Sequence, residues 1–489
     1  MMKDLKQRTI RGGVARLCSQ AATFALRLGS LMVLARLLDP KDFGLVGMVT
    51  AFTGVLSLFR DFGLSAAAVQ HISVTEEQSS TLFWVNLLVG VILGVIAVAA
   101  APAIAAFYHD SRLIAVTAAL SLGFIFNAAG VQHCAILQRQ MRFTTLATID
   151  VISLALSSGL GIAGALAGYG YWALVAMTVT SPLITTIAYW VVTAWLPRWS
   201  YNFSRIRSMM RFGGTLTLNG LVAYLAYNAD KALIGRFWGA DAIGLYGRAY
   251  QLCNIPTANL NSAVGEVAFS ALSRVQDDPK RFRSYFLKGY SLVLGFTLPI
   301  TVACTFFAPD LIMVLLGPKW KGAIEIFRLL APTIAVFAII NPLGWLLTSL
   351  GLVERGLKIA LVFAPIMISG YVLGLRHGPK GVAFGYSAVM VLWIIPHIAW
   401  CVHGTPVTLR DILRETSRPL SSAIVAGGAA LAMRILYGHL LTPLPRLVVE
   451  IAILFLIYAV VLLFVTGQKS FYLRLFKELK TPATMPVNS

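Results

Sequence analysis

The sequence predicts an all-α polytopic membrane protein of about 14 transmembrane helices, arranged as two six-helix lobes in parallel repeat plus two C-terminal helices. Composition is the first reason: 58% of the 489 residues are apolar and only 12% are charged, which leaves too little polar surface for a water-soluble globule. The second reason is a series of apolar runs of about 20 residues, the length that crosses a bilayer core. The third is an internal repeat.

The apolar runs define the expected helices. Six lie in the first half, near 12–38, 43–67, 80–107, 113–137, 145–168 and 171–196. Six more follow near 208–235, 242–270, 285–308, 322–349, 356–375 and 380–402, and two lie near 418–438 and 445–466. We therefore expect an N-terminal lobe over residues 1–200, a C-terminal lobe over residues 201–403, and two extra helices with a basic cytoplasmic tail over residues 404–489.

The repeat joins RLLDPKDFGLVG at residues 36–47 to RFWGADAIGLYG at residues 236–247. Arg36, Gly44, Leu45 and Gly47 recur at a constant offset as Arg236, Gly244, Leu245 and Gly247. A duplicated bundle of membrane helices is typical of transporters. We expect the glycines of both copies to serve tight turns at the membrane rim.

Charge sets the expected orientation. Most Lys and Arg outside the apolar runs fall on the side that also holds both termini, and positive residues are retained in the cytoplasm. Both termini are therefore expected in the cytoplasm, and both repeats face the same way. The basic N-terminus precedes a long run without a cleavage site, so we expect a retained first helix rather than a signal peptide.

Several functions are not expected. The net charge of +20 is spread between apolar runs rather than gathered on one basic face, which argues against nucleic-acid binding. The five Cys and seven His have no metal-ligand spacing, so we expect no metal and no cofactor. No extramembrane segment is long enough for a catalytic domain, so we do not expect an enzyme.

Charged residues inside the runs are the candidate site, because each costs several kcal/mol at the bilayer centre unless it faces a cavity or a partner. Four arginines could hold a pyrophosphate, whose oxygens match the guanidinium fork: Arg16, Arg27, Arg248 and Arg328. Arg16 and Arg27 share one helical stripe. The alternative for Arg16 is that it extends to the cytoplasmic surface.

Other in-span polar residues could line the cavity or couple transport to an ion. They are Asp61, Asp150, Asn228, Asp230, Asn259 and Glu266. Buried carboxylates can exchange a proton near neutral pH, but the sequence does not distinguish H⁺ from Na⁺ or from no coupling. Asp230 and Lys231 could instead form a structural ion pair near the outer surface.

Longer runs carry a family resemblance. ARLLDPKDFGLVGM at residues 35–48, FRDFGLSAAAVQ at 59–70, TEEQSS at 75–80 and ILQRQMRF at 136–143 resemble the lipopolysaccharide and exopolysaccharide flippases of the multidrug/oligosaccharidyl-lipid/polysaccharide exporter superfamily. The likeness continues with NADKALIGRFWGADAIGLYGRAYQL at 228–252 and FSALSRVQDD at 269–278. Ser270 departs from the pattern, since relatives commonly carry proline there.

The resemblance implies two lobes around a central cavity in the bacterial inner membrane. It also implies alternating access that flips an undecaprenyl-pyrophosphate-linked oligosaccharide from the cytoplasmic to the periplasmic leaflet. There a polysaccharide polymerase and a chain-length regulator would be its partners, besides the lipid-linked oligosaccharide and membrane lipids. The arginines are expectations from this sequence and are not carried over from relatives.

Three alternatives remain open at this point. A cation-coupled multidrug exporter of the same superfamily would favour acidic and aromatic cavity residues, whereas the in-span set here is mostly basic. A peptidoglycan-precursor flippase would share both the architecture and the basic cavity. A membrane-embedded glycosyltransferase or polymerase would need larger periplasmic loops than this chain offers.

Overall fold

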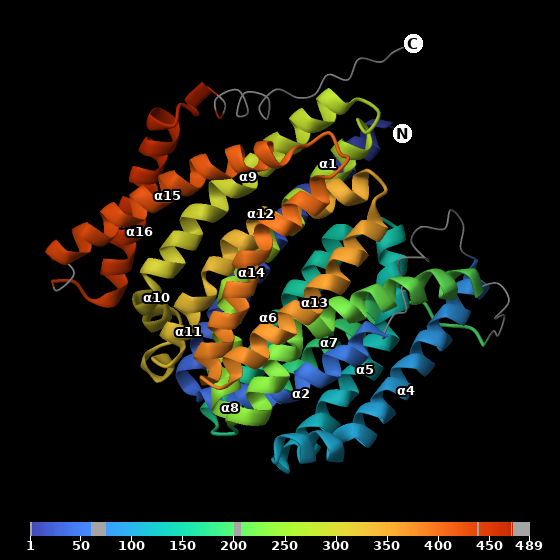
Figure 1. Cartoon of the computed structure of the whole chain (residues 1–489). Coiled ribbons are helices and arrows are strands. Elements are labelled where there is room, and N and C mark those ends of the chain that lie inside the picture. The colour runs from blue at the N-terminus through green and yellow to red at the C-terminus, as the bar shows by residue number, and fades with distance from the viewer. Residues whose placement is uncertain (1, 60–74, 200–206, 438–439, 471, 473–489) are drawn as a thin grey trace. The chain divides into compact units, whose positions relative to one another are not determined.

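The computed structural model describes residues 2–59, 75–199, 207–437, 440–470 and 472. Every long element in these ranges is a helix and none is a strand (Figure 1). The expected all-α class is therefore confirmed.

The helices follow the apolar runs closely. In the first half they are α1 (Met2–Leu37), α2 (Pro40–Leu58), α4 (Glu76–Tyr108), α5 (Arg112–Arg139), α6 (Phe143–Leu166) and α7 (Tyr171–Thr193). In the second half they are α8 (Arg207–Ser273), α9 (Pro279–Phe306), α10 (Ala308–Leu315), α11 (Ala323–Leu330), α12 (Pro332–Ser349), α13 (Val353–Leu375), α14 (Gly378–Val402), α15 (Leu409–Tyr437) and α16 (Pro443–Val460). Short 3₁₀ and π turns occupy Pro318–Trp320 and Val461–Val465.

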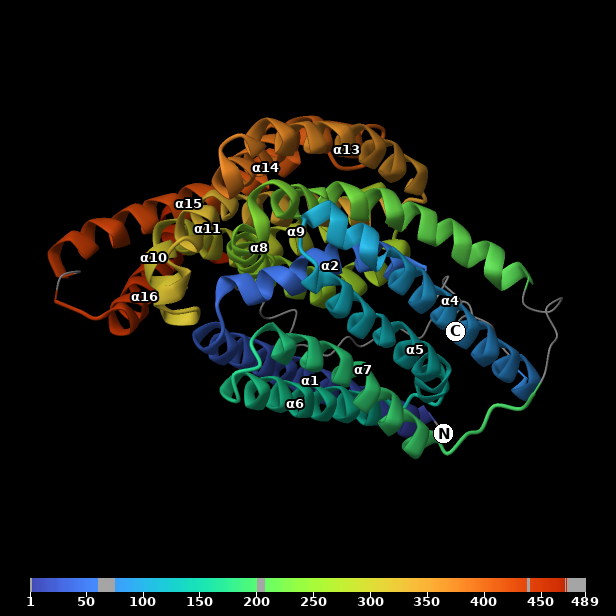
Figure 2. The ribbon, with the colours of Figure 1, turned by 90° about the horizontal axis from the view of Figure 1, so that it is seen from below.

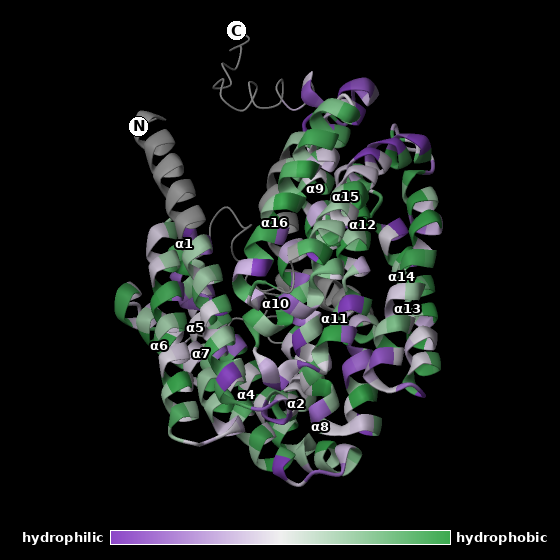
Figure 3. Ribbon diagram, turned by 90° about the vertical axis from the view of Figure 1, so that its left-hand side faces the viewer, coloured by the Kyte–Doolittle hydropathy of each residue, from purple (hydrophilic) through white to green (hydrophobic). Residues whose placement is uncertain are grey.

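Eleven spans in the described part of the chain are long and apolar enough to cross a membrane. Hydrophobic residues predominate along the long helices in Figure 3. Neither α1 nor α8 is among the eleven, and both carry several charged residues. The membrane class is thus confirmed, while the number fourteen stays a prediction.

Proline and glycine explain where the helices differ from the runs. The run 322–349 is divided into α11 and α12 at Pro332, whose ring cannot continue the hydrogen-bonding pattern of the preceding turn. The expected spans 208–235 and 242–270 form the two segments of α8, separated at Gly239. Gly239 has a φ of 79°, a conformation that side-chain-bearing residues rarely adopt. The short helix α10 was not predicted.

The helices divide into two compact units. Unit 1 contains residues 1–247, 316–320 and 363–382, and unit 2 contains residues 248–315, 321–362 and 383–489. This division cuts through α8, α13 and α14 and is distinct from the lobes expected from the repeat. The lobe boundaries at residues 200 and 403 therefore stay a proposal.

In unit 1, the helices of the first half pack side by side. Contacts join α4 to α5, α5 to α7, α7 to α6 and α6 to α1, and Figure 2 shows α1, α6 and α7 as neighbours. Small residues make these contacts close, because a methyl group on Gly90 would collide with Ala128 and one on Gly130 with Thr186. Close approach through small residues is the usual way in which membrane helices associate.

The two copies of the repeat meet within unit 1 through a reciprocal contact. A Cβ on Gly44 of α2 would overlap the backbone carbonyl of Ala240, and one on Gly244 of α8 would overlap the carbonyl of Pro40. Residues 40 and 44 correspond to residues 240 and 244 in the repeat, so the contact has two-fold character. The expectation of tight turns is wrong for these two glycines: both lie in helices, and they allow two backbones to touch.

Beside each copy of the repeat, an aromatic side chain from the other half of the chain packs against the helix. The Trp320 indole donates to the Ala35 carbonyl at 2.7 Å and meets the Phe43 ring edge-on. In the second copy, Gly235 lies against the Tyr108 ring, and Arg236 lies over Phe107. These contacts surround the reciprocal glycine contact with packed rings.

Unit 2 is centred on α9, which packs against α12, α15 and α16. The Tyr290 hydroxyl of α9 hydrogen-bonds Thr416 of α15 at 3.2 Å, and Tyr458 of α16 donates to the Gly295 carbonyl at 2.7 Å. The two extra C-terminal helices are therefore tied to the second half of the chain by polar as well as apolar contacts.

We predict that Gly44→Ala lowers the melting temperature of the purified protein, because the added methyl must displace the Ala240 backbone at a cost of about 1–3 kcal/mol. Gly247→Ala is the matched control, since it belongs to the same motif and its Cβ would meet no atom within 4 Å. Thermal unfolding in detergent measures both. Equal melting temperatures would show that the contact contributes nothing to stability.

Candidate functional site

The structure describes the side chains of six of the ten predicted site residues. The side chains of Arg16, Asp61, Asn259 and Glu266 lie outside the described residues. Of the other six, Arg27, Asp150, Asn228 and Asp230 belong to unit 1, whereas Arg248 and Arg328 belong to unit 2.

Asp230 is fully buried and engaged by the protein. Its Oδ2 accepts the Tyr246 hydroxyl at 2.7 Å, and its Oδ1 accepts the backbone N–H of Lys231 at 2.7 Å. The Lys231 ammonium donates to Asn228 Oδ1 at 2.7 Å. Since Asp230 and Tyr246 lie on opposite sides of Gly239, this cluster fixes the two segments of α8 relative to each other, and its geometry supports the structural interpretation of Asp230.

Arg27 has a different environment. It is exposed on α1, and its guanidinium makes no hydrogen bond or ion pair with any side chain in the described ranges. It interacts electrostatically with Asp150 of α6, which accepts the Tyr189 hydroxyl of α7 at 3.4 Å. Arg27 lies ten residues before the end of α1, or about 15 Å along the helix, which is about half of a bilayer core.

Arg27 therefore offers five N–H donors deep in the predicted membrane region. A phosphate or pyrophosphate group is the ligand that this donor geometry fits best. Asp150 of α6 and Tyr189 of α7 complete the polar surroundings of this guanidinium.

In unit 2, Arg248 is half-buried and donates to the Gln251 side chain. Arg328 is exposed on α11, and its side chain has no hydrogen bond or ion pair within the described part of the chain. Each unit thus contributes cationic groups. Their arrangement around one cavity stays a prediction.

A second group of charges was missed by the sequence analysis. Asp310 of α10 is buried and is paired with Arg434 of α15, at 2.9 Å, and with Arg446 of α16. Arg434 also lies 3.4 Å from Glu450 of α16. The in-span charge criterion that selected Asp230 applies equally to Arg434 and Glu450, the latter being the single acidic residue of the run 445–466. Asp310 lies two residues after the end of the apolar run 285–308, so this criterion does not select it.

This charge cluster of Asp310, Arg434, Arg446 and Glu450 is neutral in sum. Glu450 has no exposed surface, and its carboxylate oxygens make no hydrogen bond among the described residues. It depends on the nearby guanidinium of Arg434 for charge compensation. The cluster therefore fastens α15 and α16 to α10 by electrostatics inside a buried region, where a partner lost from either side leaves an uncompensated charge.

The described residues include no group of three or more His, Cys, Asp or Glu side chains that could hold a metal ion. The described part offers cationic groups that can bind an anion, and its buried carboxylates Asp230, Asp310 and Glu450 each lie beside a hydrogen-bond donor or a guanidinium.

We predict that Arg434→Met destabilises the protein by about 3 kcal/mol, because Asp310 and Glu450 lose a shared cation in a buried site. The double variant Arg434→Met/Glu450→Leu should recover part of that loss, since it removes an uncompensated carboxylate as well. Denaturation in detergent would measure the free energies of unfolding. Arg414→Met, an exposed position on the same helix, is the control, and a double variant no more stable than the single one would contradict the pairing.

Comparisons with known proteins identify the family and the fold of this chain. The model of a family described as "Polysaccharide biosynthesis protein" matches residues 33–325. The teichuronic acid biosynthesis protein TuaB of Bacillus subtilis (strain 168) is 32% identical over 68% of each chain. The succinoglycan biosynthesis transport protein ExoT of Rhizobium meliloti (strain 1021) is 24% identical over 91% of this chain and 90% of that one.

Among solved structures, the lipid II flippase MurJ in an inward closed conformation aligns with a TM-score of 0.72 at 14% identity, covering 95% of this chain and all of that one. A multidrug resistance MATE transporter in an inward-facing conformation aligns with a TM-score of 0.60 at 16% identity, covering 80% of this chain and 98% of that one. These two likenesses establish the fold. The family match spans more than half of the sequence, and the chain therefore belongs to the polysaccharide biosynthesis protein family of membrane transporters.

Proposed function

We propose that this protein flips an undecaprenyl-pyrophosphate-linked oligosaccharide from the cytoplasmic to the periplasmic leaflet of the bacterial inner membrane, by alternating access. The observation that carries the proposal is Arg27, a guanidinium deep in the predicted membrane region with no ion pair among the described residues. A charge in that position is costly unless it has a ligand or a hydrated cavity. The pyrophosphate of the carrier lipid is the ligand that fits it.

The state of the carboxylates supports an anionic cargo. Asp230 is occupied by Tyr246 and a backbone N–H, while Asp310 and Glu450 are compensated by Arg434 and Arg446. Arg328 has no such partner among the described residues, and Arg27 has only its electrostatic interaction with Asp150. The electrostatic balance available to a ligand is therefore positive, which favours a pyrophosphate over the cationic compounds of a drug exporter.

The family supports the polysaccharide pathway. The relatives' names concern teichuronic acid and succinoglycan, and we extend this class of cargo to the present chain. A polymerase and a chain-length regulator that act on the delivered repeat unit would be its functional partners. Both termini would lie in the cytoplasm, with lobes of residues 1–200 and 201–403 rocking to expose the cavity to either side.

We predict that Arg27→Ala lowers the initial rate of lipid-linked oligosaccharide transfer in proteoliposomes by about tenfold, because one charge-assisted contact is worth roughly 1.4 kcal/mol or more. Arg328→Ala should act in the same direction. Arg410→Ala, an exposed arginine at the start of α15, is the control. Wild-type rates in both cavity variants, at equal membrane abundance, would return Arg27 and Arg328 to a structural role.

Deletion of the gene tests the cargo and direction. Lipid-linked repeat units should accumulate on the cytoplasmic side, and a plasmid copy should restore their delivery. Rescue of a strain lacking its peptidoglycan-precursor flippase would instead favour that alternative. Undiminished periplasmic delivery in the deletion strain, with no second transporter of the family present, would refute the proposal.

A further inference from the structure

One face of α15 is exposed continuously from its first turn to its last. Residues that follow each other in steps of three and four lie on this face, and all of them are exposed: Arg410, Arg414, Ser417, Ser421, Ile424, Gly428, Leu431 and Ile435. Such steps keep residues on one side of an α-helix. The opposite side of α15 is buried, and the helix packs against α9 and α16. The α15 face, as we call the exposed set, is therefore open to the surroundings of unit 2.

The α15 face changes character along the helix. It begins with arginines, continues with serines and then becomes aliphatic. Ile424 and its neighbour Val425 are 53% and 54% exposed, which is favourable in hydrocarbon and unfavourable in water. Arg414 precedes Ile424 by ten residues, or about 15 Å, which is half the thickness of a bilayer core. The order of charged and aliphatic groups thus matches one phospholipid molecule in one leaflet.

The acidic residues at the start of α15 are engaged on the side of α9. Asp411 accepts a hydrogen bond from the guanidinium of Arg283 of α9 at 2.8 Å. Glu415 interacts electrostatically with Tyr290 of α9, whose side chain is buried. Neither carboxylate is therefore directed to the arginines of the α15 face.

Two arginines at this level have no counter-ion. The side chains of Arg414 and Arg418 make no hydrogen bond or ion pair with any residue that the structure describes. They are one helical turn apart, a spacing at which like charges repel each other. A phosphate can accept hydrogen bonds from both guanidiniums, and its negative charge would relieve their repulsion.

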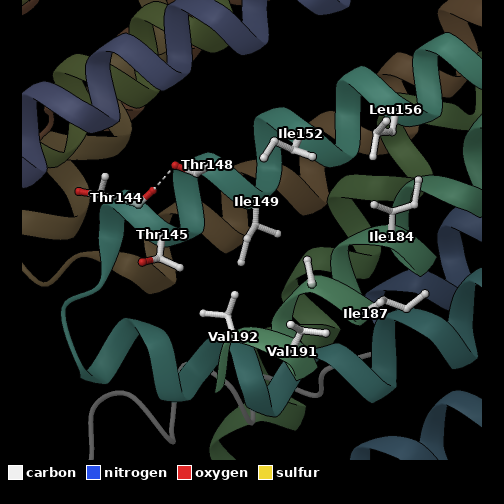
Figure 4. A pocket seen from close by; sticks show the side chains of 11 residues that line it. Thr144, Thr145, Thr148, Ile149, Ile152, Leu156, Ile184, Ile187, Val191 and Val192 are labelled. Carbon is white, nitrogen blue, oxygen red and sulfur yellow. Dashed lines mark hydrogen bonds between the residues drawn. The ribbon is translucent and has the colours of Figure 1, made fainter. Parts of the chain in front are cut away.

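The apolar groove between α6 and α7 provides a contrast. Its volume is about 650 Å³, and its lining is aliphatic apart from three threonines. Figure 4 shows Ile149 and Ile152 of α6 across from Ile187 of α7. None of the described residues that line this groove is charged. The groove therefore has no means of selecting a lipid by its charge, whereas the α15 face has one.

We propose that the α15 face binds an anionic phospholipid, whose phosphate lies between Arg414 and Arg418 and whose acyl chains lie along Ile424 and Val425. Charge selects this occupant, because an anionic lipid brings a net negative charge to the two arginines. A zwitterionic lipid brings an ammonium group as well, which cancels that attraction. A soluble anion or an acidic protein segment would contact the arginines but leave the aliphatic part uncovered. The bound phospholipid is a ligand separate from the transported cargo.

Photo-crosslinking identifies the occupant. A benzophenone amino acid replaces either Ile424 on the α15 face or Ile187 in the groove of Figure 4, two isoleucines that are 53% and 54% exposed. The full-length protein is reconstituted in vesicles of equal amounts of phosphatidylglycerol and phosphatidylethanolamine with the same acyl chains. Mass spectrometry then measures the ratio of phosphatidylglycerol to phosphatidylethanolamine adducts at each position.

We expect this ratio to be about tenfold higher at position 424 than at position 187, equivalent to about 1.4 kcal/mol of preference. Arg414→Gln/Arg418→Gln should lower the ratio at position 424 to that at position 187, because the amides do not attract the anionic lipid. Lys280→Gln/Lys358→Gln is the matched control. It removes the same charge from two exposed positions of unit 2 and should leave the ratio unchanged.

Equal ratios at positions 424 and 187 in the wild-type background would overturn the proposal, since the α15 face would then contact lipid without regard to charge. A ratio at position 424 that survives Arg414→Gln/Arg418→Gln would also overturn it. Arg414→Lys/Arg418→Lys keeps both charges and should retain most of the preference, and a loss as large as with Gln would contradict the role of charge. The vesicles contain no oligosaccharide, so none of these results depends on the proposed function.

Discussion

The contact between Gly44 and the Ala240 carbonyl, with its counterpart between Gly244 and the Pro40 carbonyl, is the constraint on which the arrangement of unit 1 depends. It brings the backbones of α2 and the second segment of α8 together at the point where the two copies of the repeat begin. Membrane helices gain no hydrophobic energy from leaving lipid, so close packing of small residues is a main source of their association. A side chain at either glycine would remove that approach.

Other contacts depend on this close approach of the α2 and α8 backbones. Trp320 reaches the Ala35 carbonyl, and Tyr108 reaches Gly235, only if the two copies lie together. The bend at Gly239 sets the direction of the second α8 segment, and the hydrogen bond from Tyr246 to Asp230 holds it. The Asp230 carboxylate thus accepts one hydrogen bond from each side of the bend.

The helices could be predicted because bilayer thickness dictates the length of an apolar run. The runs near 113–137 and 380–402 became Arg112–Arg139 and Gly378–Val402, with three of the four ends extended by one or two residues and the fourth unchanged. The role of Gly44 could not be predicted, since a glycine in a turn and a glycine at a helix contact look alike in one sequence. The helix α10 escaped prediction because its eight residues are too few to form a span.

Some features of the candidate site could likewise be predicted from the sequence, and others could not. The cost of a charge in the membrane selects Arg27 and Asp230 as residues that need a partner. Which of them has that partner within the protein depends on residues distant in sequence: Asp230 has Tyr246, whereas the Arg27 guanidinium has none among the described residues beyond its electrostatic interaction with Asp150. Arg434 and Glu450 met the same criterion, but their ion pair became evident only when α15 and α16 were placed side by side.

The proposed cargo, a lipid-linked oligosaccharide, imposes two opposite requirements on its transporter. Its pyrophosphate must exchange water for fixed cations, which Arg27 can supply from α1. Its tail must never leave apolar surroundings, because each exposed methylene costs about 0.8 kcal/mol. Within the same unit, α7 contributes Tyr189 to the Asp150 that interacts electrostatically with Arg27. Both α1 and α7 pack against α6, so Asp150 of α6 connects Arg27 of α1 with Tyr189 of α7.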